Sequence, residues 1–189
     1  MSKLIVSEFV SLNGVIEAPG GEHGHPHTGW TFESNYGEDH YQYKQDEIDE
    51  AESLLLGRKT YEGFSAAWPE REGEFADKIN SMPKYVVSST LTDPEWSNTT
   101  VLSGDVAEEI GKLKESGDGP ILVNGSAQLV HALVESDLVD EYRAMVHPVL
   151  IADGLRMFPS VDDMKLLRLA DAISYDSGVA LLIYRPAGS

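Results

Sequence analysis

The sequence predicts an α/β fold: a mixed, mostly parallel sheet flanked by helices and closed by an antiparallel hairpin at the C-terminal end of the chain. In the middle of the chain, short apolar runs typical of buried strands alternate with segments of helical period. Near the C-terminus, two strand-like runs follow one another around the turn-forming sequence Asp176-Ser177-Gly178. The 189 residues show no internal repeat and no long linker, so we expect one domain over residues 1–189.

The composition narrows the class of protein and of ligand. The formal net charge of −18 argues against a nucleic-acid partner and against an anionic membrane surface. The absence of cysteine excludes disulfides, thiolate catalysis, iron–sulfur clusters and thiolate zinc sites. No apolar run approaches the length of a membrane span, and the first residues do not form a secretion signal. We therefore expect a cytoplasmic protein.

The first strand is expected from Leu4 to Leu12, because this run is apolar and ends at the turn-forming pair Asn13-Gly14. Residues 17–37 are rich in glycine, histidine and proline, and a loop of this length in a compact domain is typical of a functional loop or lid. Residues 38–52 are acidic and compatible with a helix. A short apolar strand over 53–56 then ends at Gly57.

Helices and strands alternate through the middle of the chain. A helix is expected from Thr60 to Ala67, ending near Trp68-Pro69 because proline ends a helix. Asp105, with Glu108 three residues later, resembles the capping box that begins a helix, which would continue to Gly117. The other elements are strands over 84–89, 99–103 and 120–123, and a helix that opens at Gly125-Ser126 with Leu129, Val130, Leu133 and Val134 on one face.

The last third of the chain is predicted to be antiparallel. A strand is expected over 141–151, interrupted in character at His147-Pro148, and the terminal hairpin pairs residues 166–175 with residues 179–184.

Three segments share a feature that points to a ligand: each is an apolar run that ends in small polar residues. They are Gly57-Arg58-Lys59-Thr60-Tyr61-Glu62, Val86-Val87-Ser88-Ser89-Thr90 and Leu122-Val123-Asn124-Gly125-Ser126. Strand ends of this kind present backbone N–H groups and hydroxyls to a phosphate. Ligands in open α/β sheets bind at the carboxyl ends of the parallel strands. We therefore predict that the three segments form the walls of one site for a phosphorylated cofactor.

The order of these segments, GRKTYE, then KYVVSST, then LVNGSAQL, resembles the dihydrofolate reductase fold. The stretch from Gly125-Ser126 through Leu138-Val139-Asp140-Glu141 and His147-Pro148-Val149-Leu150 to Gly154 and Phe158 is more similar to one branch of it. That branch is the reductase domain at the C-terminal end of bifunctional riboflavin-biosynthesis deaminase–reductases, together with its stand-alone relatives. The similarity runs from about Leu4 to Tyr184. No deaminase domain with its zinc signature precedes it, so no deaminase activity is implied.

The resemblance implies NADPH as the hydride donor and a small-molecule substrate. The substrate would be a small heterocycle, pterin-like or a ribosylaminopyrimidine, as in a 5-amino-6-(5-phosphoribosylamino)uracil reductase of riboflavin biosynthesis. It also implies a homodimer. The cofactor-binding residues that it implies are Val10, Leu12, Val15, Ile16, Gly57, Arg58, Lys59, Thr60, Ser88, Ser89, Asn124, Gly125, Ser126, Ala127 and Gln128. Among them, Arg58 and Lys59 would approach the 2′-phosphate and the diphosphate.

The catalytic residue stays open. Related reductase domains often carry aspartate where this chain has Asn13, and an amide cannot donate a proton as a carboxylic acid can. Dihydrofolate reductases carry a pocket carboxylate on the helix in this region, and Asp39, Asp46, Glu47 and Glu50 are all available for that role. We name Asn13, Asp39 and Asp46 as candidates.

The substrate side offers aromatic residues. Trp30, Tyr36 and Phe64 could stack on a planar heterocycle, with core packing as the alternative for each. A substrate that carries a ribosyl phosphate would need further basic residues, for which Lys44, Arg71 and Lys78 are available.

Two other functions are compatible with the residues. The chain could be a dinucleotide- or ligand-binding module of the same fold without turnover. The alternating histidines His23, His25 and His27 could bind a metal, but Gly24 and Pro26 argue against a rigid strand and no carboxylate completes the set. We therefore expect a loop here and no metal site.

Overall fold

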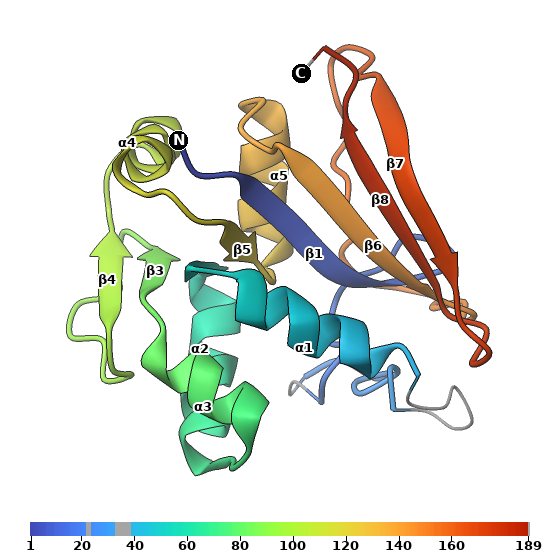
Figure 1. The fold of residues 1–189 in the computed structure, drawn as a ribbon, viewed down its shortest axis with the longest axis horizontal. Helices are drawn as coiled ribbons and strands as arrows, with labels where there is room; N and C mark the ends of the chain where they lie inside the picture. Colours follow the sequence, from blue (N-terminus) through green and yellow to red (C-terminus); the bar gives the residue numbers. More distant parts are fainter. Residues whose placement is uncertain (22–23, 33–38, 189) are drawn as a thin grey trace.

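A computed structural model describes residues 1–21, 24–32 and 39–188 of the chain. These residues form an eight-stranded sheet in the order β4-β3-β2-β5-β1-β6-β8-β7, with helices packed on both faces (Figure 1). The strands are β1 (Leu4–Ser11), β2 (Ser53–Gly57), β3 (Lys84–Val87), β4 (Thr99–Leu102), β5 (Ile121–Val123), β6 (Glu141–His147), β7 (Leu167–Ser174) and β8 (Ala180–Pro186). The helices are α1 (Tyr41–Glu50), α2 (Arg58–Ala67), α3 (Glu74–Ser81), α4 (Val106–Ser116) and α5 (Ala127–Glu135), with a 3₁₀ turn, η1, over Trp68–Glu70.

The strand directions confirm the predicted mixed sheet. Neighbouring strands from β4 to β6 are all parallel, whereas β8 runs antiparallel both to β6 and to β7, its partner in the terminal hairpin. Because parallel neighbours end at the same edge, the carboxyl ends of β3, β2, β5, β1 and β6 lie side by side.

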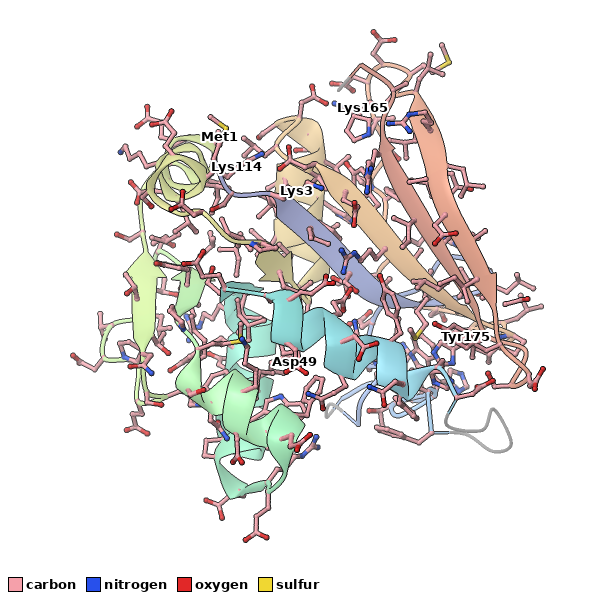
Figure 2. All side chains as sticks on the ribbon, viewed as in Figure 1. Met1, Lys3, Asp49, Lys114, Lys165 and Tyr175 are labelled. Carbon is pink, nitrogen blue, oxygen red and sulfur yellow. The ribbon has the colours of Figure 1, made fainter. Side chains whose placement is uncertain are left out.

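Two cores hold the helices against the sheet. Successive side chains of a strand point to opposite faces, so Val6 of β1 packs under α4 and α5 while its neighbour Ile5 packs under α1 and α3. The turn of the β7–β8 hairpin reaches the start of α1, where Tyr175 lies beside His40 (Figure 2). The backbone N–H of Ser177 donates to the carboxylate of Asp39 over 3.3 Å.

Some boundaries differ from those predicted. Helix α2 begins at Arg58 rather than at Thr60, with Gly57 as its N-cap. Strand β6 ends at His147 rather than at residue 151, because proline at 148 has no N–H for the ladder. The predicted start of α4 is confirmed, since the Asp105 carboxylate accepts a hydrogen bond from the N–H of Glu108 over 3.1 Å.

Helix α3 was not predicted from the sequence. Its eight residues bury only Ala76 and Ile79, which is too sparse a pattern to indicate a helix. Its last turn is held by a residue outside it: the ammonium of the buried Lys84 donates to the carbonyls of Ile79, Asn80 and Met82. In the described part of the chain, every helix is too short or too polar to cross a membrane.

Candidate functional site

The loops that follow β2 and β5 are in direct contact. The N–H of Gly57 donates to the carbonyl of Gly125 over 3.2 Å. A Cβ atom on Gly57 would lie 3.0 Å from Cβ of Ser126, and one on Gly125 would lie 2.7 Å from the Thr60 hydroxyl. Gly125 also has φ +82°, a conformation that favours glycine. Glycine at both positions therefore lets the two predicted cofactor loops close on each other.

The loop that follows β3 joins them. The guanidinium of Arg58 donates to the hydroxyl of Thr90 and, through Nε, to the carboxylate of Glu62 over 2.7 Å. The buried hydroxyl of Ser88 accepts from the N–H groups of Thr90 and Leu91, which fixes the turn, while Ser89 is exposed. The three polar segments thus converge at one edge of the sheet.

Two helix N-termini open at this edge. Helix α2 begins after Gly57, which has no side chain to cap it, and α5 begins after Ser126, whose side chain makes no capping hydrogen bond. The N–H groups of a first helical turn have no partner within the helix, and the helix dipole places partial positive charge there. The exposed side chains of Arg58 and Lys59 add two cations. This arrangement can bind a diphosphate.

A buried carboxylate supports the loop after β5. Glu8 of β1, which the sequence did not single out, accepts the N–H of Gly125 over 2.7 Å. The side chain of Asn124 is turned away from the loop, where its amide donates to the carbonyl of Ser7 over 2.8 Å. The side chain of Ala127 is buried and that of Gln128 is exposed.

The residues predicted near the nicotinamide differ in exposure. Val10, Val15 and Ile16 are buried in the cores, so only their backbone can face a ligand. Leu12, beyond the end of β1, is 66% exposed and presents its side chain at the edge where the strands end.

The aromatic candidates do not form one wall. Trp30 is 2% exposed, packs with Val15 and Ile151, and donates its indole N–H to the carbonyl of Glu17. The ring of Trp30 therefore packs in the core, which was the alternative to stacking on a substrate. Phe64 is half-buried against Trp68, and Tyr36 lies outside the described residues.

Among the acidic candidates, the structure separates two adjacent residues of α1. Asp46 faces solvent and accepts a hydrogen bond from Gln42. Glu47, the next residue, is 3% exposed and accepts hydrogen bonds from the hydroxyl of Ser7 over 2.9 Å and from the ammonium of Lys44.

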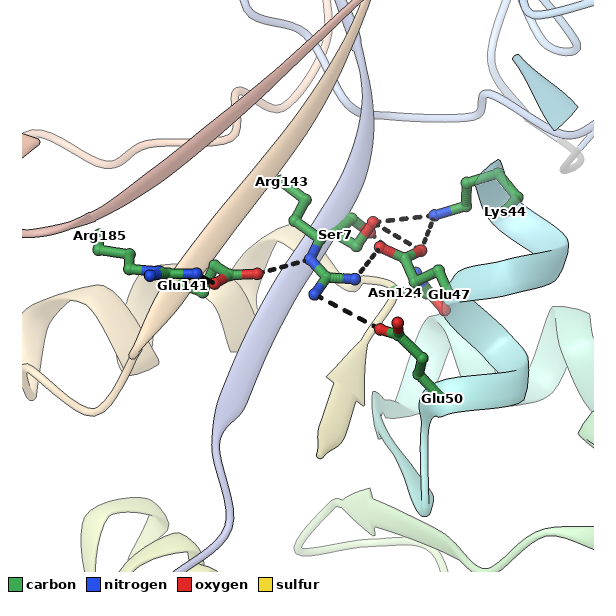
Figure 3. Close-up of polar contacts among 8 residues, drawn as sticks. All are labelled: Ser7, Lys44, Glu47, Glu50, Asn124, Glu141, Arg143 and Arg185. Carbon is green, nitrogen blue, oxygen red and sulfur yellow. Dashed lines mark hydrogen bonds and ion pairs between the residues drawn. The ribbon is translucent and has the colours of Figure 1, made fainter. Parts of the chain in front are cut away.

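Arg143 of β6 completes this charged cluster (Figure 3), since its NH1 donates to Glu47 over 3.2 Å. We call Ser7, Lys44, Glu47 and Arg143 the Ser7 cluster. Burial raises the pKa of the Glu47 carboxyl, but the Lys44 ammonium and the hydrogen bonds from Lys44 and Ser7 outweigh it and hold that pKa below its usual range. Glu47 is therefore ionised at neutral pH, and the exchangeable protons of the cluster are carried by Lys44, Ser7 and Arg143.

The Ser7 cluster is tied to the candidate cofactor site and to the hairpin. Asn124 bonds the backbone of Ser7 on one side. On the other side, Glu141 accepts from Nε of Arg143 over 2.7 Å and from Arg185 of β8 over 2.8 Å. The weak signal in the sequence was the spacing of Lys44 and Glu47, which places both on one helical face.

Asp39 is exposed at the end of the loop. Slight desolvation would raise the pKa of its carboxyl, but hydrogen bonds from Ser177 outweigh this effect and lower the pKa. Asn13 has its side-chain amide bonded to the backbone of Ile151.

The histidine loop is tied to the rest of the chain by ordinary hydrogen bonds. Nε2 of His25 lies 3.0 Å from the carbonyl of Asp153, and Nδ1 accepts the N–H of His27. His23 lies outside the described residues. No group of three or more His, Asp or Glu side chains that could hold a metal occurs in the described ranges.

Comparison with known proteins gives the family. The sequence model described as RibD C-terminal domain matches residues 2–181. YyaP of Bacillus subtilis strain 168, an uncharacterized protein, is 26% identical over 191 residues, covering 96% of this chain and 94% of YyaP.

Among solved structures, a Shewanella sp. PV-4 protein assigned to riboflavin biosynthesis has a TM-score of 0.74 at 16% identity, over 98% of this chain and 99% of its own. Enterococcus faecalis dihydrofolate reductase complexed with NADP(H) has a TM-score of 0.64 at 16% identity, over 98% and 96%. The predicted resemblance is confirmed: the fold is that of dihydrofolate reductase, and the chain belongs to the RibD C-terminal domain family.

Proposed function

We propose that the protein is an NADPH-dependent reductase of a small heterocyclic compound. Membership of the RibD C-terminal domain family and the shared fold support a reductase-type function. The observation that carries the proposal is the pair of uncapped helix N-termini, at Gly57 and Ser126, beside the exposed Arg58. A cytoplasmic location belongs to the proposal and fits the absence of cysteine.

The residues at this edge fit a phosphorylated dinucleotide. The first turns of α2 and α5 would hold its diphosphate, and Arg58 and Lys59 would approach the 2′-phosphate. When bound, NADPH supplies the hydride. The protein's part is to orient the two reactants and to exclude water, which in well-oriented systems contributes up to about 7–11 kcal/mol.

The Ser7 cluster is the proposed source of the proton. Glu47 is ionised, so it holds Lys44 in place and cannot itself act as the acid. The Lys44 side chain is partly open to solvent, unlike that of Glu47, and its ammonium carries the protons that a reduced nitrogen or oxygen needs. The substrate class that we propose is a planar pterin-like or ribosylaminopyrimidine compound, whose polar edge would contact this ammonium.

An NADPH-oxidation assay against pterins and ribosylaminopyrimidines, with NADPH binding measured by calorimetry, tests the proposal. We expect NADPH binding and turnover of at least one compound. Binding without turnover on any compound would make the protein a ligand-binding module instead. Failure to bind NADPH would overturn the cofactor site itself.

Lys44→Met tests the proton source. We expect turnover to fall by about 100-fold while the NADPH dissociation constant stays within about twofold, because general acid catalysis contributes about 10²–10⁴-fold. Lys112→Met, on the exposed surface of α4, is the matched control and leaves both quantities unchanged. Unaltered turnover in Lys44→Met would exclude Lys44 as the acid.

The terminal hairpin supports a homodimer, which we propose as the working form. Strand β7 is the edge strand of the sheet, and it and the residues before it expose apolar side chains, among them Leu169 at 50% and Met164 at 76%. Pairing of two copies across a two-fold axis would cover them. We expect a dimer in light scattering and a monomer for Leu169→Asp. Phe32→Asp, at an exposed apolar residue of the 24–32 loop, should remain dimeric. A monomeric wild-type protein contradicts the proposal.

A further inference from the structure

Two loops are hydrogen-bonded to each other beyond the edge of the sheet. The β1 loop (residues 12–17) follows β1, and the β6 loop (residues 148–157) follows β6, whose last residue His147 lies opposite Ser11. The two backbones are joined from Leu12 N–H to the carbonyl of Val149 over 2.8 Å and from Ile16 N–H to that of Leu155 over 2.9 Å. A third bond runs from the N–H of Met157 to Gly14.

The side chain of Asn13 bridges the two loops in the way that a backbone peptide group bridges neighbouring strands of a sheet. The Asn13 amide donates from Nδ2 to the carbonyl of Ile151 over 2.7 Å, and its Oδ1 accepts the N–H of Ile151 over 3.1 Å. The Ser11 hydroxyl donates to the same Oδ1 over 2.9 Å and accepts the N–H of Val15 over 2.8 Å. Asn13 therefore links the backbone of the β6 loop to both ends of the turn in the β1 loop.

The backbone fixes the orientation of this amide. If the side chain were reversed, its NH₂ group would face the N–H of Ile151 and its oxygen would face the carbonyl of Ile151. A carboxylate at position 13 could keep the contacts of Oδ1 only by placing its second oxygen 2.7 Å from that carbonyl, where no proton could lie between them. The repulsion between the two oxygens would push the loops apart and weaken the Oδ1 contacts as well. Only an amide, or a protonated carboxylic acid, fits both partners.

Besides Asn13, charged or titratable side chains contact the backbone of the two loops. The guanidinium of Arg156 donates to the backbone carbonyl of Asn13, and the Glu17 carboxylate accepts the N–H of Leu155 over 2.9 Å. His131 of α5 bonds the carbonyl of Arg156 over 2.7 Å. These contacts hold the C-terminal end of the β6 loop, and Nε2 of His25 lies 3.0 Å from the carbonyl of Asp153 near its middle. Asn13 is the side chain that bonds both the N–H and the carbonyl of one residue of this loop.

We infer that Asn13 is a positioning residue. Its amide clamps the β6 loop to the β1 loop, and this clamp fixes the wall of the candidate cofactor site to which Leu12 belongs. Leu12 is the exposed side chain of that wall, and its backbone N–H and that of Val15 are held by bonds of the same network. The catalytic consequence of the clamp rests on the proposed reductase function, but the clamp itself does not.

Hydrogen exchange of the variants Asn13→Asp and Asn13→Ala tests the clamp without any assumption about activity. We expect the amides of Ile151 and Val15 to lose protection together, by about tenfold or more, at pH 7.5. Asn98→Asp is the matched control, because the Asn98 amide also donates to a backbone carbonyl, that of Ser81 over 2.7 Å, at the opposite end of the strands. It should leave both loops unchanged. Retained protection in both Asn13 variants would overturn the inference.

Lowering the pH adds a readout that a merely structural role would not give. A protonated aspartic acid can donate to the carbonyl of Ile151, so Asn13→Asp should regain protection of Ile151 as the pH is lowered from 7.5 to about 4, near the usual pKa of aspartic acid, relative to the wild-type protein at each pH. Arg156 lies close enough to favour the ionised form and would shift this recovery to lower pH. Asn13→Ala cannot recover. Parallel pH profiles for the two variants would contradict the clamp.

Single-turnover kinetics then separate positioning from proton donation. If Asn13 positions the wall, Asn13→Asp lowers the rate of hydride transfer by about tenfold at pH 7.5 and leaves the NADPH dissociation constant within about twofold. Recovery of the clamp at low pH would bring the rate of Asn13→Asp back to that of the wild-type protein at most, whereas an aspartic acid that supplied the proton would raise it above the wild-type rate at the same pH. Absence of any turnover in the wild-type protein would refute the proposed function. The hydrogen-exchange data would still test whether Asn13 clamps the two loops. Should either variant fail to fold, Ser11→Ala, which removes the hydroxyl between Asn13 and Val15, is expected to give the same pattern of exchange.

Discussion

At the scale of single residues, Arg58 shows how local contacts hold a side chain that we propose to bind a phosphate. It stands at the first position of α2, and its guanidinium is shared between Glu62, one turn along the helix, and the hydroxyl of Thr90. These partners hold the planar group in place before any ligand arrives. Because the pair with Glu62 is exposed, it contributes at most about 0.5 kcal/mol and can be exchanged for a phosphate at little cost.

Arg58→Ala should therefore change the choice of cofactor. Only NADPH has a 2′-phosphate, and a charge-assisted hydrogen bond contributes about 1.5–3 kcal/mol, so NADPH affinity is expected to fall by about 10–150-fold. NADH affinity should change by less than about threefold. Arg71→Ala is the control, since Arg71 is also exposed but stacks on Trp68 instead. Calorimetric titration with each dinucleotide measures both affinities, and equal losses would show that Arg58 does not face the 2′-phosphate.

The acidic side chains of α1 were the part of the candidate site that the sequence could not resolve. From the sequence alone, Asp46 is a named candidate and the adjacent Glu47 is only available for the same role, because α1 has too few apolar residues to define its inner face. The distinction comes from Ser7 and Arg143, which lie 40 and 96 residues from Glu47 in the chain. Contacts at such separations depend on strand register and helix placement, which no local pattern records. The predicted cofactor residues, by contrast, follow strand ends that the apolar runs mark directly.

At the scale of elements, β2 and α3 show why some boundaries were predictable and others were not. Strand β2 is a continuous run of buried residues that ends at glycine, and its bounds match the prediction. Helix α3 has only two buried residues, Ala76 and Ile79, and its C-terminus depends on Lys84, a residue of the following strand. A helix stabilised from outside leaves little trace in its own sequence.

Lys84→Met is expected to destabilise α3 and, through it, the whole fold. Methionine matches the length of lysine but donates no hydrogen bond, so the carbonyls of Ile79, Asn80 and Met82 lose the donor that the ammonium provides. We expect the free energy of unfolding to fall by about 2–3 kcal/mol, the range for hydrogen bonds to a charged group. Urea denaturation measures it. Lys78→Met, in α3 itself, removes only a long 3.3 Å hydrogen bond to the carbonyl of Asp49 and should cost less than about 0.5 kcal/mol. Equal costs would show that the buried ammonium is not what holds the helix.

At the scale of the whole molecule, the sheet places two different environments on the face that α1 covers. Near the start of β6, Glu141 and Arg143 belong to a fully paired ionic network with α1 and β8. At the end of the same strand, His147 is buried among the rings of Phe9, Trp30 and His40, with ring centroids 5.3–5.5 Å apart. The ionic end keeps its pairs while Glu47 and Glu141 are ionised, and their lowered pKa values extend this state to more acidic pH. The end with His147 is stable only while the imidazole stays neutral.

His147 should therefore set an acid limit on stability. Burial, with a smaller contribution from His40, lowers the pKa of His147 from 6.5 to about 4. The unfolded chain then binds more protons than the folded one between these values, so stability is full above about pH 6.5 and falls as the pH drops toward 4. The total loss is about 3 kcal/mol, at about 1.4 kcal/mol for each pKa unit. Urea denaturation at several pH values between 4 and 8 measures this slope.

The matched variant is His147→Phe, which keeps a flat ring among Phe9, Trp30 and His40 but cannot take up a proton. The substitution can change the free energy of unfolding at neutral pH. Below pH 6.5, however, the free energy of unfolding of the variant should depend less on pH than that of the wild-type protein. A slope remains, because burial also lowers the pKa of His40, whose ring contacts Asp39 on its other side. Identical slopes for the two proteins would place the acid sensitivity in the carboxylates of the ionic network instead, since those with a lowered pKa also lose stability as the pH falls. The comparison therefore shows which end of the strand fails first in acid.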